Sequence, residues 1–365
     1  MRWREFSFSV VAIIVLVSCG WAQEEFPKLT LSGVLDARLV KTDEGISWLE
    51  GGLGKVRYGN GDDKLLARLS QASLLLSIAA SEQLSGRIHI NVDAEPNDEL
   101  RGGRVDIIEA FASYRPVLSP YLRLRLRGGL FFPPVSLENT GRGWTTPYTI
   151  TTSAINSWIG EEVRATGAEG SLVFALNSNE LTITAAAFGN NDPTGSLLAW
   201  RGWSLHDRQS GLSDRVPLAA IPAVEEGGLF AQQPRYVDPL REIDGRIGYY
   251  TAVGWERSGI ELRALYVNNR GEQTLFDGSQ YAWKTDFVNL GAHISLPKDL
   301  EILSQFLAGT SRMGPGSMAY IDFYSTYVLA SVAFDRNRLS LRYDDFRVHD
   351  NDHFRTADNN EESGS

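Results

Sequence analysis

Three arginines at alternate positions are the residues of this 365-residue sequence best placed for chemistry. Arg123, Arg125 and Arg127 are separated by single leucines, and alternate side chains of a β-strand share one face. At ~3.3 Å per residue, their guanidinium groups would form a row about 13 Å long. Guanidinium groups pair bidentately with carboxylates and phosphates. The row therefore predicts anion selection, provided that it lines a narrow passage.

A second interpretation gives the same arginines a purely structural role. They would neutralise acidic side chains on neighbouring strands and select no solute. In a wide lumen, charges farther apart than the ~8 Å Debye length at physiological salt influence one another little. The candidate partners for this role are Asp93, Glu169 and Glu261.

The sequence offers little support for catalysis. Nucleophilic catalysis requires a nucleophile, a base and an orienting group that converge, whereas the five histidines are dispersed. His206 lies near Ser204 and Asp207, at a spacing that defines no motif. The segment 349–353 has the composition of a cation site, but its spacing matches no known loop and a solvated acidic surface explains it better. We therefore expect no enzyme, no metal and no cofactor.

The elements that position these residues are predicted to be β-strands. Apolar and polar residues alternate in segments of about ten residues, which is typical of half-buried strands. In one such segment, Ile88 and Ile90 oppose Arg87 and His89. Thirteen strands are predicted, near residues 29–40, 66–79, 84–93, 105–115, 121–129, 163–176, 180–189, 244–256, 260–268, 281–296, 300–309, 320–334 and 338–348.

The lengths of the connections decide between two all-β folds. Alternation suits a soluble sandwich and also a membrane barrel, in which apolar side chains face lipid and polar ones face the lumen. Short polar turns, such as 80–85 and 115–120, alternate strictly with long connections, such as 41–65, 128–162 and 190–243. Outer-membrane barrels have short periplasmic turns and long extracellular loops. We therefore predict a transmembrane antiparallel β-barrel.

The N-terminus predicts a cleavable signal peptide over residues 1–22, which leaves a barrel over 23–365. Two arginines precede an apolar core, and a small-x-small site follows at residues 20–22. The apolar stretch is shorter than the ~20 residues that a spanning helix needs. The alternative is a lipoprotein box that would leave Cys19 as a lipidated first residue.

The overall composition excludes several classes of protein. The chain carries 45 acidic and 35 basic residues, a formal net charge of −10, whereas nucleic-acid partners select basic faces. A single cysteine excludes a disulfide framework and a thiolate metal site. A hydrophobic content of 43% argues against a disordered chain.

Three motifs resemble a known family. Residues 127–134 (RGGLFFPP), 153–164 (SAINSWIGEEVR) and 341–348 (LRYDDFRV) are similar to proteobacterial outer-membrane porins related to the phosphate-selective porin family. The resemblance implies a homotrimer of 16-stranded barrels that passes small hydrophilic solutes, with anion selectivity in some members. No phosphate-coordinating residue can be carried over, and the lysine-rich entrance of a phosphate-selective member is not evident in this acidic chain.

The end of the sequence bears on the number of strands. An antiparallel bacterial barrel needs an even number of strands, and residues 358–365 show no apolar alternation. We expect the sequence to be truncated within an extracellular loop. Three further strands would complete the sixteen that the resemblance implies.

The third long connection, 128–162, is expected to fold into the lumen and narrow it. Its aromatic residues would be unusual in a freely solvated loop. Glu161 and Glu162, if they face the lumen, would oppose the arginines and create a transverse field. The expected constriction-loop residues are Glu138, Trp144, Tyr148, Trp158, Glu161, Glu162 and Arg164. The expected pore-lining residues are Arg87, Arg123, Arg125, Arg127, Arg263 and Arg342.

We therefore predict a passive outer-membrane diffusion channel for small hydrophilic solutes, with small anions such as phosphate as candidates. Its partners would be outer-membrane lipid, the solute and two further copies of the chain. The alternative is a non-conducting barrel that serves as a surface receptor or structural platform. In that case the proline-containing 190–243 connection would be an epitope, a trimer latch or a plug.

Overall fold

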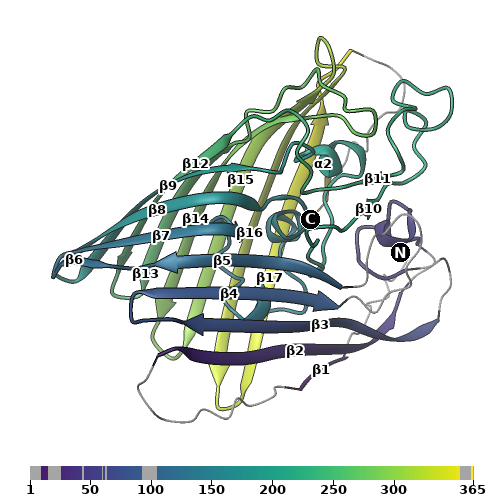
Figure 1. Ribbon diagram of the computed structural model, residues 1–365. Coiled ribbons are helices and arrows are strands. Elements are labelled where there is room, and N and C mark those ends of the chain that lie inside the picture. The colour runs from purple at the N-terminus through teal and green to yellow at the C-terminus, as the bar shows by residue number, and fades with distance from the viewer. Residues whose placement is uncertain are drawn as a thin grey trace.

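One antiparallel β-sheet dominates the computed structural model, which describes residues 10–14, 26–42, 45–59, 61, 64–92, 105–353 and 363–364. Figure 1 shows the sheet curving around an interior. The sheet contains sixteen strands within this described part. Three of them are short: β1 (Val10–Ile14), β6 (Val117–Ser119) and β18 (Ser363–Gly364).

The thirteen long strands pair antiparallel in chain order, which confirms the predicted all-β antiparallel fold and its strand positions. Alternating apolar and polar residues form these strands because each face then meets one environment. They are β2 (Lys28–Lys41), β3 (Leu65–Ala79), β4 (Leu84–Val92), β5 (Val105–Tyr114), β7 (Leu122–Phe131), β8 (Ala165–Leu176), β9 (Asn179–Gly189), β12 (Gly248–Arg257), β13 (Ile260–Asn268), β14 (Lys284–Leu296), β15 (Leu300–Met313), β16 (Ala319–Phe334) and β17 (Asn337–Asp350).

The first strand of the sheet lies within the predicted signal peptide. β1 pairs with β2 from Val10 opposite Leu39 to Ile14 opposite Leu35. Cleavage after residue 22 would remove β1 and leave this edge of β2 without that partner. The signal peptide stays a prediction, and Cys19 lies outside the described residues.

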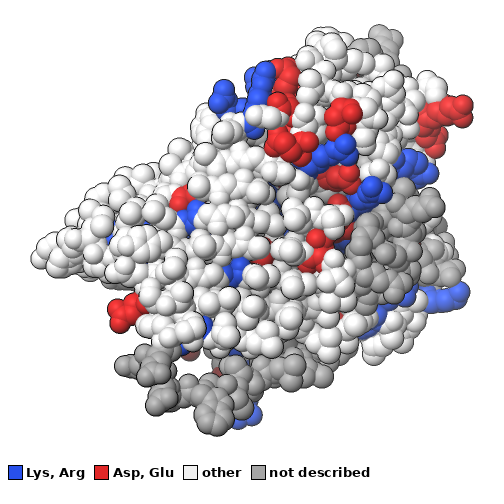
Figure 2. All heavy atoms as spheres, viewed as in Figure 1, with Lys and Arg blue, Asp and Glu red and all other residues white. Residues whose placement is uncertain are grey.

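The outer face of the sheet is apolar. On β2, Leu29 and Leu31 are 68% and 58% exposed, whereas Asp36 and Arg38 are buried on the inner face. On β17, Leu341 is 77% exposed. Figure 2 shows a broad uncharged surface over the strands, with most of the visible charge near the end that carries the long loops. This is the reverse of a soluble protein, in which apolar residues are the buried ones.

Two long loops fill the interior at one end of the sheet. Residues 132–164 contain η2 (Arg142–Trp144) and α1 (Ala154–Glu162), and residues 190–247 contain α2 (Ser196–Trp200) and the hairpin of β10 (Val216–Pro217) and β11 (Tyr236–Val237). We call these two segments the plug. A third loop carries η1 (Trp48–Glu50). Figure 1 shows α2, β10 and β11 at the end opposite the β6–β7 turn.

The hydrophobic core of the protein lies inside the sheet. Trp158 of α1 packs edge-on against Trp203, Phe287 and Phe323. Trp200 of α2 meets Trp283, again edge-on. The inner faces of β14 to β17 therefore carry apolar residues where they meet the plug, whereas an entirely polar inner face was expected.

The sequence after the predicted signal peptide shows no helical signature, whereas the structure contains two short helices in its loops. Ser153 caps α1 by accepting a hydrogen bond from the backbone N–H of Asn156. Ile155, Trp158 and Ile159 follow at helical spacing, and all are buried. Within the described residues, no helix has the length and apolar character needed to cross a membrane.

Candidate functional site

A polar cavity of about 800 Å³ occupies the interior at the end with the tight turns. Its wall comes from the inner faces of β2 to β5, β7 to β9, β12 and β13, and it carries six basic and four acidic side chains. Four of the six expected pore-lining residues line it: Arg87, Arg125, Arg127 and Arg263. Arg123 and Arg342 are not among its lining residues.

The three arginines of β7 are paired with carboxylates on the neighbouring strands. Arg123 forms an ion pair with Glu180, and Arg125 lies 3.6 Å from the same carboxylate. Arg127 pairs with Glu169 at 2.8 Å. Two guanidinium groups therefore share one carboxylate, which leaves this part of the wall with a net positive charge.

The structural interpretation of the arginines anticipated some of these pairs. Glu169 pairs with Arg127, and Glu261 pairs with Arg263 on its own strand. Asp93 lies outside the described residues. The role of Glu180 was missed, although alternation along β9, two strands from β7, would have placed it on the same face of the sheet.

Two arginines of the cavity wall also fix the beginning of the plug. Arg127 donates to the carbonyl oxygen of Phe132 at 3.2 Å. Arg263 donates to the carbonyl oxygens of Pro134 and Ser136, both at 3.2 Å. The start of the plug therefore bounds the cavity on the side of the long loops. The arginines that give the wall its positive charge also hold the plug in position.

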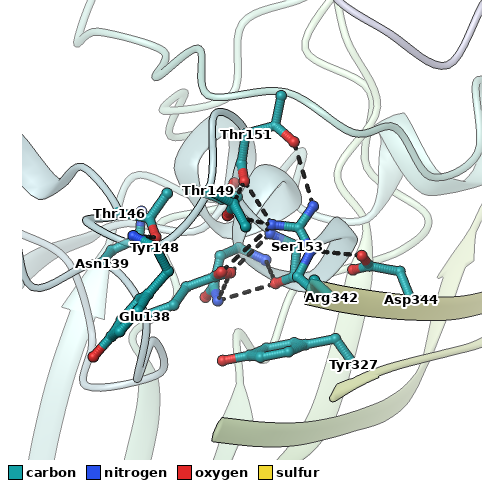
Figure 3. A network of polar contacts seen from close by, with 12 residues as sticks. Glu138, Asn139, Thr146, Tyr148, Thr149, Thr151, Ser153, Tyr327, Arg342 and Asp344 are labelled. Carbon is teal, nitrogen blue, oxygen red and sulfur yellow. Dashed lines mark hydrogen bonds and ion pairs between the residues drawn. The ribbon is translucent and has the colours of Figure 1, made fainter. Parts of the chain in front are cut away.

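Arg342 of β17 anchors the middle of the 132–164 loop (Figure 3). Its guanidinium donates to Thr149 Oγ1 at 2.9 Å and to the Thr151 carbonyl oxygen at 2.5 Å. It also donates to Asp344 at 2.6 Å and lies 3.6 Å from Glu138. Arg342 thus binds the loop to the wall instead of lining the open cavity.

Glu138 is enclosed in the same network. It accepts hydrogen bonds from the backbone N–H of Ser153 at 2.8 Å and from the side-chain amide of Asn156 at 2.7 Å (Figure 3). Burial raises the pKa of Glu138, which the nearby Arg342 and these donors oppose. The carboxylate therefore organises the start of α1.

Trp144 packs within the same loop, and Tyr148 reaches the barrel wall. Trp144 stacks on Phe132 with ring centroids 4.1 Å apart. The Tyr148 hydroxyl donates to Glu301 at 2.6 Å, and burial together with this carboxylate raises the pKa of Tyr148. These contacts explain why the loop carries aromatic residues.

Glu161 joins the two segments of the plug. Its carboxylate receives two hydrogen bonds from Arg201, at 3.1 and 2.6 Å, and lies 3.1 Å from His206 Nε2. Burial alone would raise the pKa of Glu161, but Arg201 and His206 more than offset it and hold the pKa at about 2. The pair is fully enclosed and faces the core of the plug.

Glu162 binds the start of α2. It accepts hydrogen bonds from the Trp158 indole at 2.5 Å, the Ser196 hydroxyl at 2.9 Å and the Leu197 backbone N–H at 3.1 Å. Burial raises the pKa of Glu162 to about 7 against the effect of these donors. Because neither Glu161 nor Glu162 faces the cavity, they do not provide the transverse field that was considered for them.

Arg164 follows α1 and is buried. Its guanidinium donates to the carbonyl oxygens of Ile108 at 2.9 Å and Gly160 at 2.7 Å, and it lies 4.4 Å from the centroid of the Phe132 ring. Burial lowers the pKa of Arg164 to about 10, which Glu109 and other acidic groups partly oppose.

Two charged clusters in the loops were missed from the sequence. Asp207 forms ion pairs with Arg38 and Arg57, and these arginines lower its pKa against the effect of burial. Asp192, Glu242 and Asp244 place carboxylate oxygens within 4.8 Å of one another. Burial raises the pKa of Asp192 to about 6, although its oxygen accepts backbone N–H groups. These residues are far apart in the sequence, so no local spacing indicated either cluster.

Comparison with known proteins gives similarity at the level of structure. No protein-family model and no curated protein matches the chain. The chain is similar to the outer membrane channel DcaP of Acinetobacter baumannii, with 11% identity, coverage of 91% of this chain and 94% of that chain, and a TM-score of 0.42. The chain is also similar to Pseudomonas aeruginosa OccK7 (OpdD), with 10% identity, coverage of 94% of this chain and 88% of that chain, and a TM-score of 0.42. A third similar structure is OmpF of Salmonella typhi in complex with daunomycin, with 12% identity, coverage of 87% of this chain and 98% of that chain, and a TM-score of 0.34.

Proposed function

We propose that this protein is a passive outer-membrane channel for small hydrophilic solutes. Solutes would enter the interior and pass the plug down a concentration gradient, without chemical change. The role needs no catalytic group and no cofactor. Small anions are the favoured solutes in this proposal, because the cavity wall carries more basic than acidic side chains.

The reversal of the two faces of the sheet is the observation that carries this proposal. Large apolar side chains are exposed on the outer face, while charged groups line a cavity of about 800 Å³ inside. Exposing so many leucines to water would be unfavourable, since burial of apolar surface is worth roughly 25 cal/mol per Å². An apolar belt around a polar interior suits a protein surrounded by lipid.

Aromatic residues at the ends of the outer face support the same location. Tyr114 and Phe334 lie close to the tight turns and are 43% and 53% exposed. Tyr249 lies at the opposite end of the sheet and is 40% exposed. Aromatic girdles of this kind mark the two interfaces of membrane barrels.

Electrical recording in planar lipid bilayers tests the proposal. Purified protein, reconstituted from detergent, should produce stepwise current increases, and vesicles containing it should swell in small sugars. Heat-denatured protein is the control for detergent leakage. If native, membrane-inserted protein produces neither current nor swelling, the channel proposal fails.

The plug favours a second candidate function, which is a non-conducting surface platform. Trp158, Trp200 and Trp203 are fully buried between the plug and the wall, so the loop end of the interior is filled with apolar residues. A platform would insert into membranes and give no swelling, and the same recordings therefore separate the two functions.

Two other features of the proposal come from the sequence resemblance, namely assembly as a homotrimer and a preference for phosphate or another small anion. Export through a signal peptide at residues 1–22 comes from the residue pattern of the N-terminus. Cross-linking of the membrane-inserted protein would test the trimer, and the mature N-terminal residue would test the cleavage site.

A further inference from the structure

The plug has an apolar side and a polar side. Its apolar side packs against β14 to β17, where Trp158 and Trp203 meet Phe287 and Phe323. Ser311 of β15 is sealed beneath α2 and bonds Thr285 at 2.6 Å. The rings leave no passage where they pack, and polar groups beside them are bonded to one another, as Arg342 is to Thr151 and Asp344, so this side of the plug is closed.

The polar side of the plug faces β3 to β5. On the wall, Ser73 donates to Asn91 at 2.6 Å, and His89 Nε2 lies 2.9 Å from the same amide oxygen. A second cavity of about 30 Å³ lies between this wall and the plug, and Asn91 and Gln209 are among its lining residues. Its volume is sufficient for a water molecule.

Several buried polar atoms along this boundary have no hydrogen-bond partner among the described residues. They are His89 Nδ1, Gln209 Oε1, Ser210 Oγ and Arg164 Nε, and their residues are at most 6% exposed. Buried polar groups are normally satisfied by protein or water. Comparable atoms, such as Asn289 Nδ2 and Ser325 Oγ, also occur on the side of β14 to β17. What distinguishes the boundary with β3 to β5 is the second cavity beside these four atoms, which offers them room for water.

The boundary is tightest where η2 of the plug approaches the wall. Gly143 lies so close that a Cβ there would be 3.2 Å from His89 Nε2. Gln209 donates to the Gly143 carbonyl oxygen at 2.8 Å. Below this point the wall continues through Arg87 into the large cavity, and above it lies the second cavity.

We propose that solutes cross the plug along this boundary, between β3 to β5 and the 206–214 segment, with the contact between His89 and Gly143 as its narrowest point. This inference rests on the proposed channel function and adds to it the side on which the channel passes the plug. The opposite boundary, against β14 to β17, stays closed.

A pair of cysteine variants tests the route. Ser73→Cys lies on the polar side and Ser311→Cys on the apolar side, and the two serines are similarly buried, at 6% and 0% exposure. Each variant is recorded in planar bilayers before and after addition of 2-hydroxyethyl methanethiosulfonate, a small uncharged thiol reagent. The mixed disulfide formed at Ser73→Cys should reduce the current by at least half, and Ser311→Cys should keep its initial current.

The comparison within one variant makes the result independent of any effect of the substitution itself. Mass spectrometry of the recorded protein gives the extent of modification. A conducting Ser73→Cys channel that is unmodified or unblocked overturns the route, as does a block confined to Ser311→Cys. Both results leave the channel function intact, whereas a silent wild-type protein would remove the channel and the route together.

Discussion

Individual charged residues in the interior have two kinds of environment. Arg125 and Glu180 are partly exposed in the polar cavity, whereas Glu161 and Arg201 are enclosed in the plug. An ion pair in the first environment contributes only about 0–1 kcal/mol. Breaking a buried pair by removal of one partner typically costs about 3–5 kcal/mol. The first group is therefore suited to tuning ion passage, and the second to holding the plug.

The charge of the cavity wall leads to the first prediction. Arg125→Ala removes one of the two guanidinium groups that share Glu180, so anion preference should fall. Glu180→Gln removes the shared carboxylate, so anion preference should rise. Reversal potentials under a salt gradient measure both changes. Shifts of the same sign in the two variants would contradict a role of this wall in selectivity.

The Glu161–Arg201 pair leads to a prediction about acid. The pKa of Glu161 in the folded state, about 2, lies below the usual ~4.3 of a glutamate. The ionised pair therefore contributes its full stability to the folded state at pH values above about 4.3. This stability is lost as the pH falls from about 4.3 towards 2. Thermal unfolding followed by circular dichroism should therefore show a smaller acid-induced loss for Glu161→Gln than for the wild type.

Glu180→Gln is the control for this acid dependence, because Glu180 is partly exposed. Its acid-induced loss should match that of the wild type. Equal losses in wild type and Glu161→Gln would mean that the plug does not depend on the ionised carboxylate.

At the scale of elements, the short helix α2 is held where the plug meets β14 and β15. Gly195 precedes the helix with a φ of 101°, and a Cβ there would collide with Ser311 Oγ and Thr285 Oγ1. Glu162 accepts hydrogen bonds from the first residues of the helix. The helix is therefore positioned by contacts from α1 and from two strands, since five residues do not form a stable helix alone.

Gly195→Ala should destabilise the plug more than Gly227→Ala does. Both glycines have positive φ, which costs an alanine about 1–2 kcal/mol, but nothing lies within 4 Å of a Cβ at Gly227. The difference between the variants isolates the collision with β14 and β15. Urea unfolding of the membrane-inserted protein should show the larger loss for Gly195→Ala, and equal losses would refute the close fit of α2.

The strands were predictable from the sequence, whereas the plug was not. A strand with one face in each environment shows its period of two locally, as in β7 and β17. The plug depends on contacts between distant residues, such as Arg342 with Thr151 and Glu161 with Arg201. Ser153 and the spacing of Ile155 with Trp158 are compatible with the start of a helix, but no helix was predicted there, because a nine-residue helix buried on all sides lacks the polar face that identifies longer ones.

At the scale of the whole molecule, the protein has an apolar exterior, a charged cavity and an apolar core inside the sheet. Of the six arginines expected to line the pore, Arg87, Arg125, Arg127 and Arg263 line the cavity at the tight-turn end. At the loop end, the inner faces of β14 to β17 carry large apolar side chains that the plug covers, beside buried polar ones such as Asn289 and Gln305. One sheet therefore supplies a wall for water in one half and a packing surface in the other.

Adjacent residues of β9 give a prediction for the whole arrangement. Ile183 is 46% exposed on the outer face, and Thr182 lines the cavity. Ile183→Arg should lower the unfolding free energy in lipid by about 2–4 kcal/mol if it lies near the bilayer midplane. Thr182→Arg should have little effect on stability but should alter the conductance. Similar destabilisation by both variants would contradict the assignment of the two faces.

The distribution of tryptophan gives the protein a natural optical probe. Trp48, Trp158, Trp200, Trp203 and Trp283 are fully buried inside the sheet, and Trp144 stacks against Phe132. Among the described tryptophans, only Trp255 shares a strand face with the exposed Val253, and it also borders the cavity. Bromine-labelled lipid tails should therefore quench only a small part of the fluorescence. Four of the seven described tryptophans, Trp144, Trp158, Trp200 and Trp203, belong to the plug, so a change in emission wavelength would report a change in its packing.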